Sequence, residues 1–196
     1  GTLAGVPPGI VNVILGGKDQ VQTLIRHPAI AKVDFTGGPV AGRAIGAAAG
    51  GNLASVTQEL GGKAPMIVCA PKYYEQLDKA TVDTILQPLV NGCAFGAFIA
   101  SGQTCIAGTR LLVDARLYEQ FCAKLVAKTK VFRLEDTLDL ETTIGPVITR
   151  KQMDWIHETV QTAKTASTST EGMLKILCGG KPYDGLAGTP FANGHY

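Results

Sequence analysis

The sequence lacks the residue clusters that mark several common classes of protein. Its five cysteines include no C-x-x-C pair and its three histidines show no metal-ligand spacing, so neither a disulfide framework nor a metal site is expected. Eighteen basic and sixteen acidic residues leave a net charge of +2 with no lysine or arginine cluster, which gives no electrostatic reason to expect nucleic acid as a partner. The cysteine usage fits a reducing, cytoplasmic setting.

Long apolar runs are also missing. The longest near-apolar stretch, residues 92–100, is far shorter than the ~20 residues that a membrane-spanning helix needs. The N-terminus lacks the basic-then-apolar layout of a secretion signal. We therefore expect no membrane partner. What is present is the composition of an ordinary globular protein, 45% hydrophobic and 17% charged, in a chain long enough for one large or two small domains.

The first third of the chain alternates short strands with short helices. β-branched and apolar runs predict strands over Val11–Leu15, Lys32–Phe35 and residues 54–60. Helical spacing predicts helices over residues 18–27 and 39–49, the second with a proline in its first turn. This alternation is typical of an α/β fold class, a parallel sheet with flanking helices.

The pattern restarts after Gly61 and Gly62, where we place a domain boundary. The sequence predicts a strand over Met66–Ala70 and a long helix over Tyr74–Ile99 that is interrupted at Pro88. The remaining predicted elements are a strand over 109–115, amphipathic helices over 116–128 and 148–166, and a strand over 174–180.

One candidate binding motif is "FTGGPVAGRAIG". Thr36 ends a predicted strand, and Gly37, Gly38 and Gly42 open or enter the next helix. Free backbone N–H groups at a helix N-terminus suit an anion, and missing side chains let a pyrophosphate approach. The alternative is a tight strand-to-helix turn with no ligand, since a chain with 24 glycines contains such spacings by chance.

A second candidate is "QELGGK", in which Glu59 closes a predicted strand. Open α/β sheets hold ligands at the carboxyl ends of their strands. A partly desolvated glutamate there can have its pKa raised toward neutrality and act as a general base. The alternative is a solvated glutamate followed by two glycines that only turn the chain.

A third candidate is Cys105, which follows the long predicted helix in "GQTCIAG". A catalytic cysteine needs its thiolate form, access to substrate and nearby N–H donors for an oxyanion. Cys69, Cys93, Cys122 and Cys178 lie in apolar stretches or inside predicted elements, and we interpret them as packing residues. Cys105 could also be a buried, inert thiol, because free cysteine is among the most buried residue types.

Taken in order, "PPGIVNVILG", "FTGGPVAG", "ELGGKAP", "GQTCIAGTRLLV" and "IGPVITRKQ" resemble the aldehyde dehydrogenase superfamily. The resemblance covers nearly the whole chain, and its most specific parts are "ELGGK" and "GQxC". It implies that residues 1–61 are the C-terminal half of a Rossmann-like NAD(P)-binding domain. It implies that residues 62–196 are the N-terminal part of the catalytic domain, which bears the thiol.

The resemblance implies roles for two side chains. The Cys105 thiolate would attack an aldehyde carbonyl, and the resulting thiohemiacetal would pass a hydride to the nicotinamide and become a thioester. The backbone N–H of Cys105 would help to hold the oxyanion. Glu59 would activate the water that releases the carboxylic acid. Relatives that pass the acyl group to coenzyme A usually lack this glutamate, so its presence favours hydrolysis.

The implied cofactor is NAD or NADP, and the implied substrate is a small-molecule aldehyde. Thr36, Gly37, Gly38 and Gly42 would lie along the cofactor, and the Leu60 carbonyl would contact the nicotinamide amide. The choice between NAD and NADP and the identity of the aldehyde stay open, because the family recognises the ribose and much of the substrate outside this stretch.

The sequence departs from the family pattern in three ways. Gly38 stands where the family usually has a serine that helps to bind the pyrophosphate. Glu59 and Cys105 are 46 positions apart, about three helical turns more than usual, with the surplus in residues 73–92. The family's chain is also more than twice as long as this one.

We therefore expect the chain to be the central portion of an aldehyde dehydrogenase that forms homo-oligomers at full length. By itself it is expected to have little or no activity and to associate through uncovered sheet edges. Two alternatives stay open: a non-catalytic homologue that survives as a scaffold or pseudogene product, and a thioester hydrolase built on Cys105 and Glu59.

Overall fold

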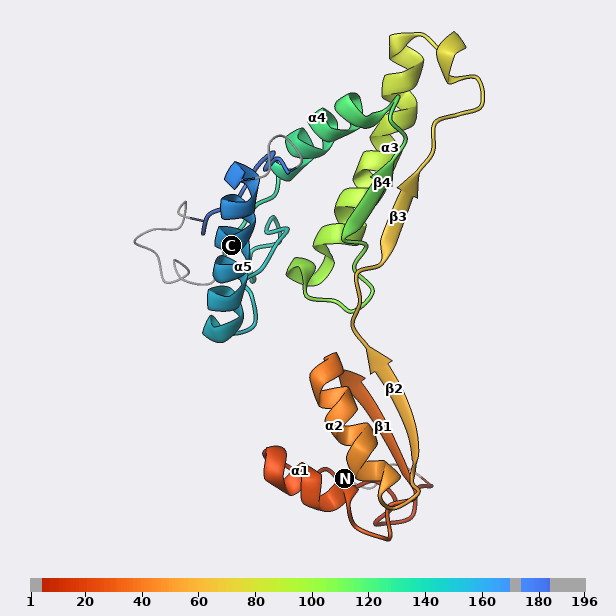
Figure 1. The fold of residues 1–196 in the computed structure, drawn as a ribbon, viewed down its shortest axis with the longest axis vertical. Helices are drawn as coiled ribbons and strands as arrows, with labels where there is room; N and C mark the ends of the chain where they lie inside the picture. The colour runs from red at the N-terminus through yellow and green to blue at the C-terminus, as the bar shows by residue number, and fades with distance from the viewer. Residues whose placement is uncertain (1–4, 170–173, 184–196) are drawn as a thin grey trace. The chain divides into compact units, whose positions relative to one another are not determined.

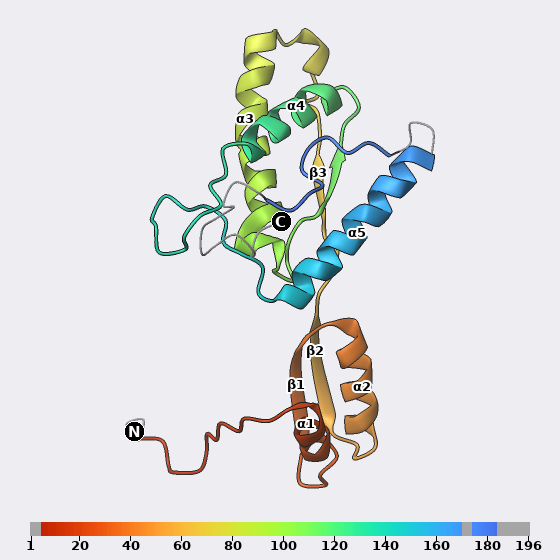
Figure 2. The same ribbon diagram turned by 90° about the vertical axis from the view of Figure 1, so that its left-hand side faces the viewer.

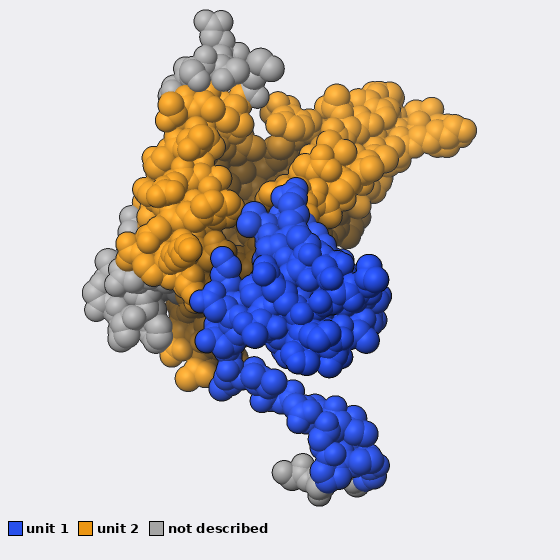
Figure 3. Space-filling model, turned by 60° about the horizontal axis from the view of Figure 1, so that its bottom comes forward, with its two compact units in different colours: residues 1–61 blue, residues 62–196 orange. Residues whose placement is uncertain are grey.

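The structure is a computed structural model that describes residues 5–169 and 174–183. The chain folds as two compact units, Gly1–Gly61 and Gly62–Tyr196 (Figures 1 and 3). The boundary falls between the two glycines at which the sequence pattern restarts. Each unit has its own hydrophobic core.

The first unit is a two-stranded parallel sheet with two helices. Its elements are α1 (Lys18–Ile25), β1 (Lys32–Gly37), α2 (Pro39–Gly50) and β2 (Ser55–Leu60). β1 and β2 pair in parallel from Lys32↔Ser55 to Gly37↔Leu60. α2 is the crossover helix that such a parallel connection requires. It covers one face of the sheet, where Ile45, Ala48 and Ala49 pack against half-buried side chains of β1 and β2 (Figure 1).

The second unit repeats this arrangement with a longer crossover. Its elements are β3 (Pro65–Val68), η1 (Tyr74–Gln76), α3 (Lys79–Phe98), η2 (Ile99–Gly102), β4 (Arg110–Val113), α4 (Tyr118–Thr129) and α5 (Arg150–Ser169). β3 and β4 pair in parallel, from Pro65↔Arg110 to Val68↔Val113. α3 lies along this pair of strands (Figures 1 and 2). The expected α/β class with parallel pairing is therefore confirmed, as two small sheets of two strands each among the described residues.

The core of the second unit lies between α3, α4 and the two strands. Leu86 and Val90 of α3 and Phe121 of α4 are almost fully buried there, together with Leu117 and Val68. Segment 73–92, the surplus relative to the family pattern, forms η1 and most of α3. Segment 73–92 contains the buried α3 residues Val82, Leu86 and Val90, so it forms part of the hydrophobic core of the second unit.

Two predicted strands are absent. Residues 11–15 and 174–177 are irregular, and Val11, Val13 and Leu15 are mostly exposed. β-branched residues favour a pleated surface only when a neighbouring strand offers hydrogen bonds and packing. No strand of the described residues pairs with either segment.

The predicted break at Pro88 is also wrong, because α3 runs through it without interruption. The break lies before the helix, at Leu77 and Asp78. There the Asp78 carboxylate caps α3 by accepting a 2.7 Å hydrogen bond from the Thr81 N–H. Pro88 removes one backbone donor, and burial of the apolar positions on either side of it holds the helix together.

Among the described residues, the stretch Lys79–Gly102 is long and apolar enough to cross a membrane by length and composition alone. One face of this stretch, which includes Val82, Leu86, Val90, Cys93 and Ala94, is buried in the core of the second unit. Packing explains only part of its apolar composition, since 22% of its most apolar part is buried, and the absence of a membrane partner stays a prediction.

Leu53 gives a first testable prediction about stability. It follows α2 with a left-handed backbone (φ +57°) and a side chain that is 94% exposed, so its Cβ is strained and its side chain contributes no packing. We expect Leu53→Gly to raise the free energy of unfolding by about 0.5–1 kcal/mol. Urea unfolding followed by far-UV circular dichroism measures it. Leu53→Ala, which keeps the Cβ, is the matched control and should bring no gain.

Candidate functional site

Thr36 and Glu59 are direct neighbours in the first unit. They are register partners near the carboxyl ends of β1 and β2. Both side chains are exposed, on the face of the sheet that α2 does not cover. Their alignment at the carboxyl edge matches the place where parallel sheets hold ligands. The partial desolvation invoked for a general-base glutamate is not present within this unit taken alone.

The three predicted cofactor glycines differ in what their missing side chains do. A Cβ at Gly38 would meet nothing within 4 Å, so the N-terminus of α2 is open there. A Cβ at Gly42 would lie 2.8 Å from Leu60 Cδ2, and the Gly42 carbonyl accepts a 2.6 Å hydrogen bond from Gln58 Nε2. A Cβ at Gly37 would fall against the Phe35 ring. Gly37 and Gly42 thus allow close packing, whereas Gly38 leaves room for a ligand.

The N-terminus of α2 is an anion-compatible end. Pro39 has no N–H, and the first helical hydrogen bond runs from the Gly42 N–H to the Gly38 carbonyl (2.9 Å). The N–H groups of Val40 and Ala41 precede that bond, and Gly38 provides no side-chain cap. Gly38 directly follows β1, so these donors lie at the carboxyl end of that strand.

Cys105 occupies a tight turn in the second unit. The turn is closed by a 3.2 Å hydrogen bond from the Ala107 N–H to the Thr104 carbonyl, so Cys105 and Ile106 are its two central residues. Cys105 is exposed, whereas Ala107 is buried. None of the hydrogen bonds found among the described residues uses the N–H of Cys105. The thiol is therefore exposed and its own backbone donor has no partner within the described part of the chain, which is compatible with the oxyanion interpretation.

A methionine wedged between two glycines fixes the end of this turn. The Gly108 N–H donates to the Gly96 carbonyl of α3 at 3.0 Å. A Cβ at Gly108 would lie 2.5 Å from Met66 Cγ, and one at Gly96 would lie 3.0 Å from Met66 Sδ. The Met66 side chain thus occupies the volume that side chains at positions 96 and 108 would need, and this holds α3, the turn and β3 close together.

The other cysteines are only partly as expected. Cys93 is buried, and burial raises the pKa of its thiol, which disfavours the thiolate. Cys122 is half-buried on α4. Cys69 and Cys178 are exposed, so interpreting them as packing residues was wrong. Cys69 follows the last residue of β3, and the Cys178 sulfur lies 3.7 Å from the Thr129 hydroxyl oxygen of α4.

Two contacts around Cys105 escape sequence analysis. The Ser101 hydroxyl donates to the Gly145 carbonyl at 2.8 Å, and the Ile148 N–H donates to Gln103 Oε1 at 2.8 Å. These bonds join residues 44 and 45 positions apart. The "GQxC" and "IGPVI" segments were both noted in the sequence, but nothing in either segment indicates that they contact each other.

The structure thus gathers the candidate residues into two groups. Thr36, Gly37, Gly38, Glu59 and Leu60 share the carboxyl edge of the first sheet, and Gly42 lies one helical turn away. Cys105 lies in the second unit. That Glu59 and Cys105 face one cleft stays a prediction. Among residues 5–169 and 174–183, no group of three or more histidine, cysteine or acidic side chains could hold a metal ion.

Known proteins show the same pattern of segments. The Rhizobium leguminosarum betaine aldehyde dehydrogenase is 37% identical over 179 residues, which are 91% of this chain and 33% of that protein. The zebrafish 4-trimethylaminobutyraldehyde dehydrogenase B is 35% identical over 92% of this chain and 31% of its own. This chain spans about a third of the length of the curated relatives that it matches.

Solved structures match as well. The Staphylococcus aureus betaine aldehyde dehydrogenase in complex with NAD⁺ superimposes with a TM-score of 0.77 at 30% identity, over 92% of this chain and 32% of that one. An NADP-dependent enzyme from Escherichia coli gives the same TM-score and identity, over 92% and 34%. Residues 2–192 match the aldehyde dehydrogenase family as a whole. The chain belongs to the aldehyde dehydrogenase family.

Proposed function

We propose that this chain carries the central chemistry of an NAD(P)-dependent aldehyde dehydrogenase, with Cys105 as the nucleophile and Glu59 as the base for hydrolysis. The observation that carries the proposal is the exposed Cys105 thiol in a tight turn, with an N–H that no hydrogen bond among the described residues uses. A nucleophile must be reachable by its substrate, and the tetrahedral oxyanion must meet a donor.

The first unit supports the cofactor half of the proposal. The open N-terminus of α2 at Gly38 offers the Val40 and Ala41 N–H groups to a phosphate. Thr36 and the Leu60 carbonyl flank this end at the carboxyl edge of the sheet. We therefore assign residues 1–61 to an NAD(P)-binding domain and residues 62–196 to the thiol-bearing domain of a longer, oligomeric, cytoplasmic enzyme.

The chemistry at Cys105 needs a hydride acceptor, which a bound nicotinamide would supply. The chain's own groups do the rest. The Cys105 sulfur forms the covalent bond to the carbonyl carbon, and the Cys105 N–H donates to the oxygen that becomes negative. The Glu59 carboxylate takes a proton from the water that releases the acid. Gly38 lacks the serine hydroxyl usual in the family, so the backbone donors of α2 would bind the phosphate with one hydrogen bond fewer.

The test replaces the matching segment of the Staphylococcus aureus betaine aldehyde dehydrogenase by residues 2–192 of this chain. We expect this chimaera to reduce NAD⁺ in the presence of betaine aldehyde, as followed by absorbance at the NADH band. Cys105→Ala should abolish NADH formation, because no thiohemiacetal can form. Cys178→Ala, at another exposed thiol, is the matched control and should leave the rate unchanged. A folded chimaera whose Cys105→Ala variant still reduces NAD⁺ would contradict the proposal.

A further inference from the structure

We infer that Ser101 and Gln103 are positioning residues for Cys105, which hold the turn that presents the thiol by clamping it to segment 144–148. The inference rests on the proposed function, since it concerns the placing of that nucleophile. The two side chains lie four and two residues before Cys105, and neither is itself part of the reacting chemistry.

The backbone before Cys105 is in a conformation that it would not adopt unaided. Ala100, Ser101 and Gly102 have φ values of +52°, +56° and +72°, three successive left-handed residues. Only glycine enters this region without a steric penalty from its Cβ. Strained residues of this kind persist when surrounding contacts over-determine them, and they gather at functional sites. Contacts that impose the conformation on Ala100 and Ser101 must therefore exist nearby.

Those contacts are the two hydrogen bonds to the distant segment. The Ser101 hydroxyl donates to the Gly145 carbonyl, and Gln103 Oε1 accepts from the Ile148 N–H, each at 2.8 Å. Ser101 and Gln103 lie on either side of Gly102, so their hydrogen bonds fix the chain immediately before and after this left-handed glycine. Nearby in the chain, the ring of Phe98, which ends α3, meets the ring of Phe132 edge to face with centroids 5.3 Å apart; Phe132 precedes segment 144–148 by twelve residues.

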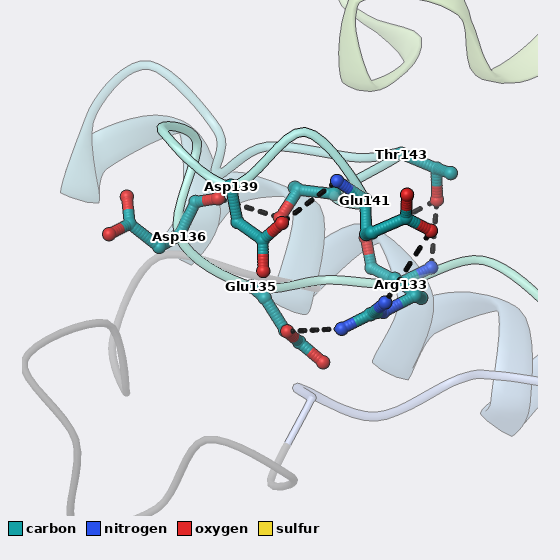
Figure 4. A network of polar contacts seen from close by, with 7 residues as sticks. Arg133, Glu135, Asp136, Asp139, Glu141 and Thr143 are labelled. Carbon is teal, nitrogen blue, oxygen red and sulfur yellow. Dashed lines mark hydrogen bonds and ion pairs between the residues drawn. The ribbon is translucent and has the colours of Figure 1, made fainter.

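The segment that receives the clamp is itself braced. Residues 133–143 form a loop whose ends are joined: the Arg133 N–H donates to Thr143 Oγ1 at 2.7 Å, and the Thr143 N–H donates to the Arg133 carbonyl at 3.0 Å (Figure 4). The Arg133 guanidinium pairs with Glu135 and Glu141. Two further hydrogen bonds fold the loop on itself: the Thr142 hydroxyl donates to the Asp136 carbonyl at 2.6 Å, and the Glu141 N–H donates to Asp139 Oδ1 at 2.9 Å. Gly145 follows this closed loop after one residue, so Ser101 is held against a braced segment.

The clamp leads straight into the turn that carries the nucleophile. Gln103 is followed by Thr104, whose carbonyl closes the turn with the Ala107 N–H. Residues 100–103 are held at one side of the turn and Gly108 is held at the other by its hydrogen bond to Gly96, so the turn is constrained at both ends. Small displacements of a reacting group are costly in catalysis, which gives such a clamp a purpose.

Hydrogen exchange of the Ala107 amide tests the clamp at a distance from the changed side chains. Gln103→Met keeps the length of the side chain but removes the acceptor, and Gln103→Glu keeps an acceptor oxygen. In the full chain we expect Gln103→Met to speed exchange of the Ala107 N–H at least tenfold, and Gln103→Glu to stay within about threefold of the native rate. The Phe121 N–H, which is bonded to the Leu117 carbonyl in α4, is the reference for intact folding and should not change.

Ser101 gives a second, independent comparison. Ser101→Ala removes the hydroxyl but keeps the strained Cβ, so it should speed Ala107 exchange as Gln103→Met does. Ser101→Gly removes the hydroxyl and the strain together, so it should speed exchange less. Equal exchange in Ser101→Ala, Gln103→Met and the native chain, or a Gln103→Glu variant no better protected than Gln103→Met, would overturn the inference.

The same substitutions in the betaine aldehyde dehydrogenase chimaera connect the clamp to catalysis. We expect Gln103→Met to lower kcat at least tenfold with KM for NAD⁺ changed less than twofold, and Gln103→Glu to restore most of kcat. If the unsubstituted chimaera is folded but inactive, the proposed function fails, while the exchange measurement on the chain still decides whether the clamp exists. If kcat is unaffected although exchange is faster, the clamp is structural and its positioning role is overturned.

Discussion

Replacing Glu59 by glutamine in the chimaera is expected to separate the two halves of the reaction. The Cys105 thiol can still attack the aldehyde and yield NADH, but no carboxylate remains to activate water. A general base of this kind contributes about 10²–10⁴-fold. We therefore expect one equivalent of NADH to form rapidly and steady turnover to fall by about that factor. Stopped-flow absorbance measures both phases, and mass spectrometry should find the acyl group on the peptide that contains Cys105.

Glu119→Gln, at an exposed carboxylate on α4, is the matched control and should leave both phases unchanged. The prediction has a structural basis, because Glu59 lies next to Thr36 at the carboxyl edge of the first sheet. Loss of the first NADH equivalent in Glu59→Gln would show that Glu59 acts before or during hydride transfer, which contradicts the role assigned to it. Steady turnover at the native rate would remove Glu59 from the mechanism.

Phe121→Ala is expected to have the largest effect on stability. The Phe121 ring is 1% exposed and lies in the core between α3, α4 and β3. Truncating a buried phenylalanine removes its apolar burial and leaves a cavity, with a cost of about 3–5 kcal/mol. This is a large part of the about 5–15 kcal/mol that stabilises an ordinary domain. Urea unfolding followed by far-UV circular dichroism should show the midpoint shifted sharply downward.

Tyr118→Ala provides the comparison within the same helix. Tyr118 lies one turn before Phe121 and is 49% exposed, so its truncation should cost well under half as much. Equal losses from the two substitutions would mean that the core assigned to α3 and α4 does not carry the stability of the second unit. The two variants have the same type of change at neighbouring positions, which removes helix propensity as an explanation.

Sequence patterns predicted those elements whose stability is local or whose partner is close. α1 and α2 have regular apolar spacing and lie within one residue or two of their predicted bounds. β1 and β2 are separated by a single crossover helix, so each residue of β1 finds its partner 23 positions later, as in Lys32↔Ser55. Residues 11–15 contain β-branched residues, as β1 does, but no strand of the described residues pairs with them.

The helix before the cysteine shows a different limit. Pro88 indicated a break because proline removes a donor, yet Leu86 and Val90 on either side of it are fully buried and keep α3 continuous. Asp78 is a residue type that favours the position just before a helix, but helical spacing alone predicted a start at Tyr74. Burial outweighed the proline, and burial depends on α4, which lies further along the chain.

At the site, residue types were predictable and their neighbours were not. Cys105 could be chosen among five cysteines from its small and polar flanks; it is exposed in a turn, but Cys69 and Cys178 are exposed too, so the choice stays a prediction. The register of Thr36 with Glu59 follows from parallel pairing once both strands are known. The contacts of Ser101 and Gln103 could not be predicted from the sequence, because their partners are backbone groups, which every segment of the chain offers.

The Met66 side chain lies between Gly96 and Gly108, so the sizes of the side chains at these three positions depend on one another. A Cβ at Gly108 would overlap the Met66 side chain, and a Cβ at Gly96 would require the Met66 sulfur to shift by a few tenths of an ångström. These positions should therefore covary: an alanine at 96 or 108 is compatible with a shorter residue at 66. The same close fit makes the sulfur a vulnerable point, since conversion of Met66 to its sulfoxide adds an oxygen where there is no room and would push the cysteine turn away from the sheet.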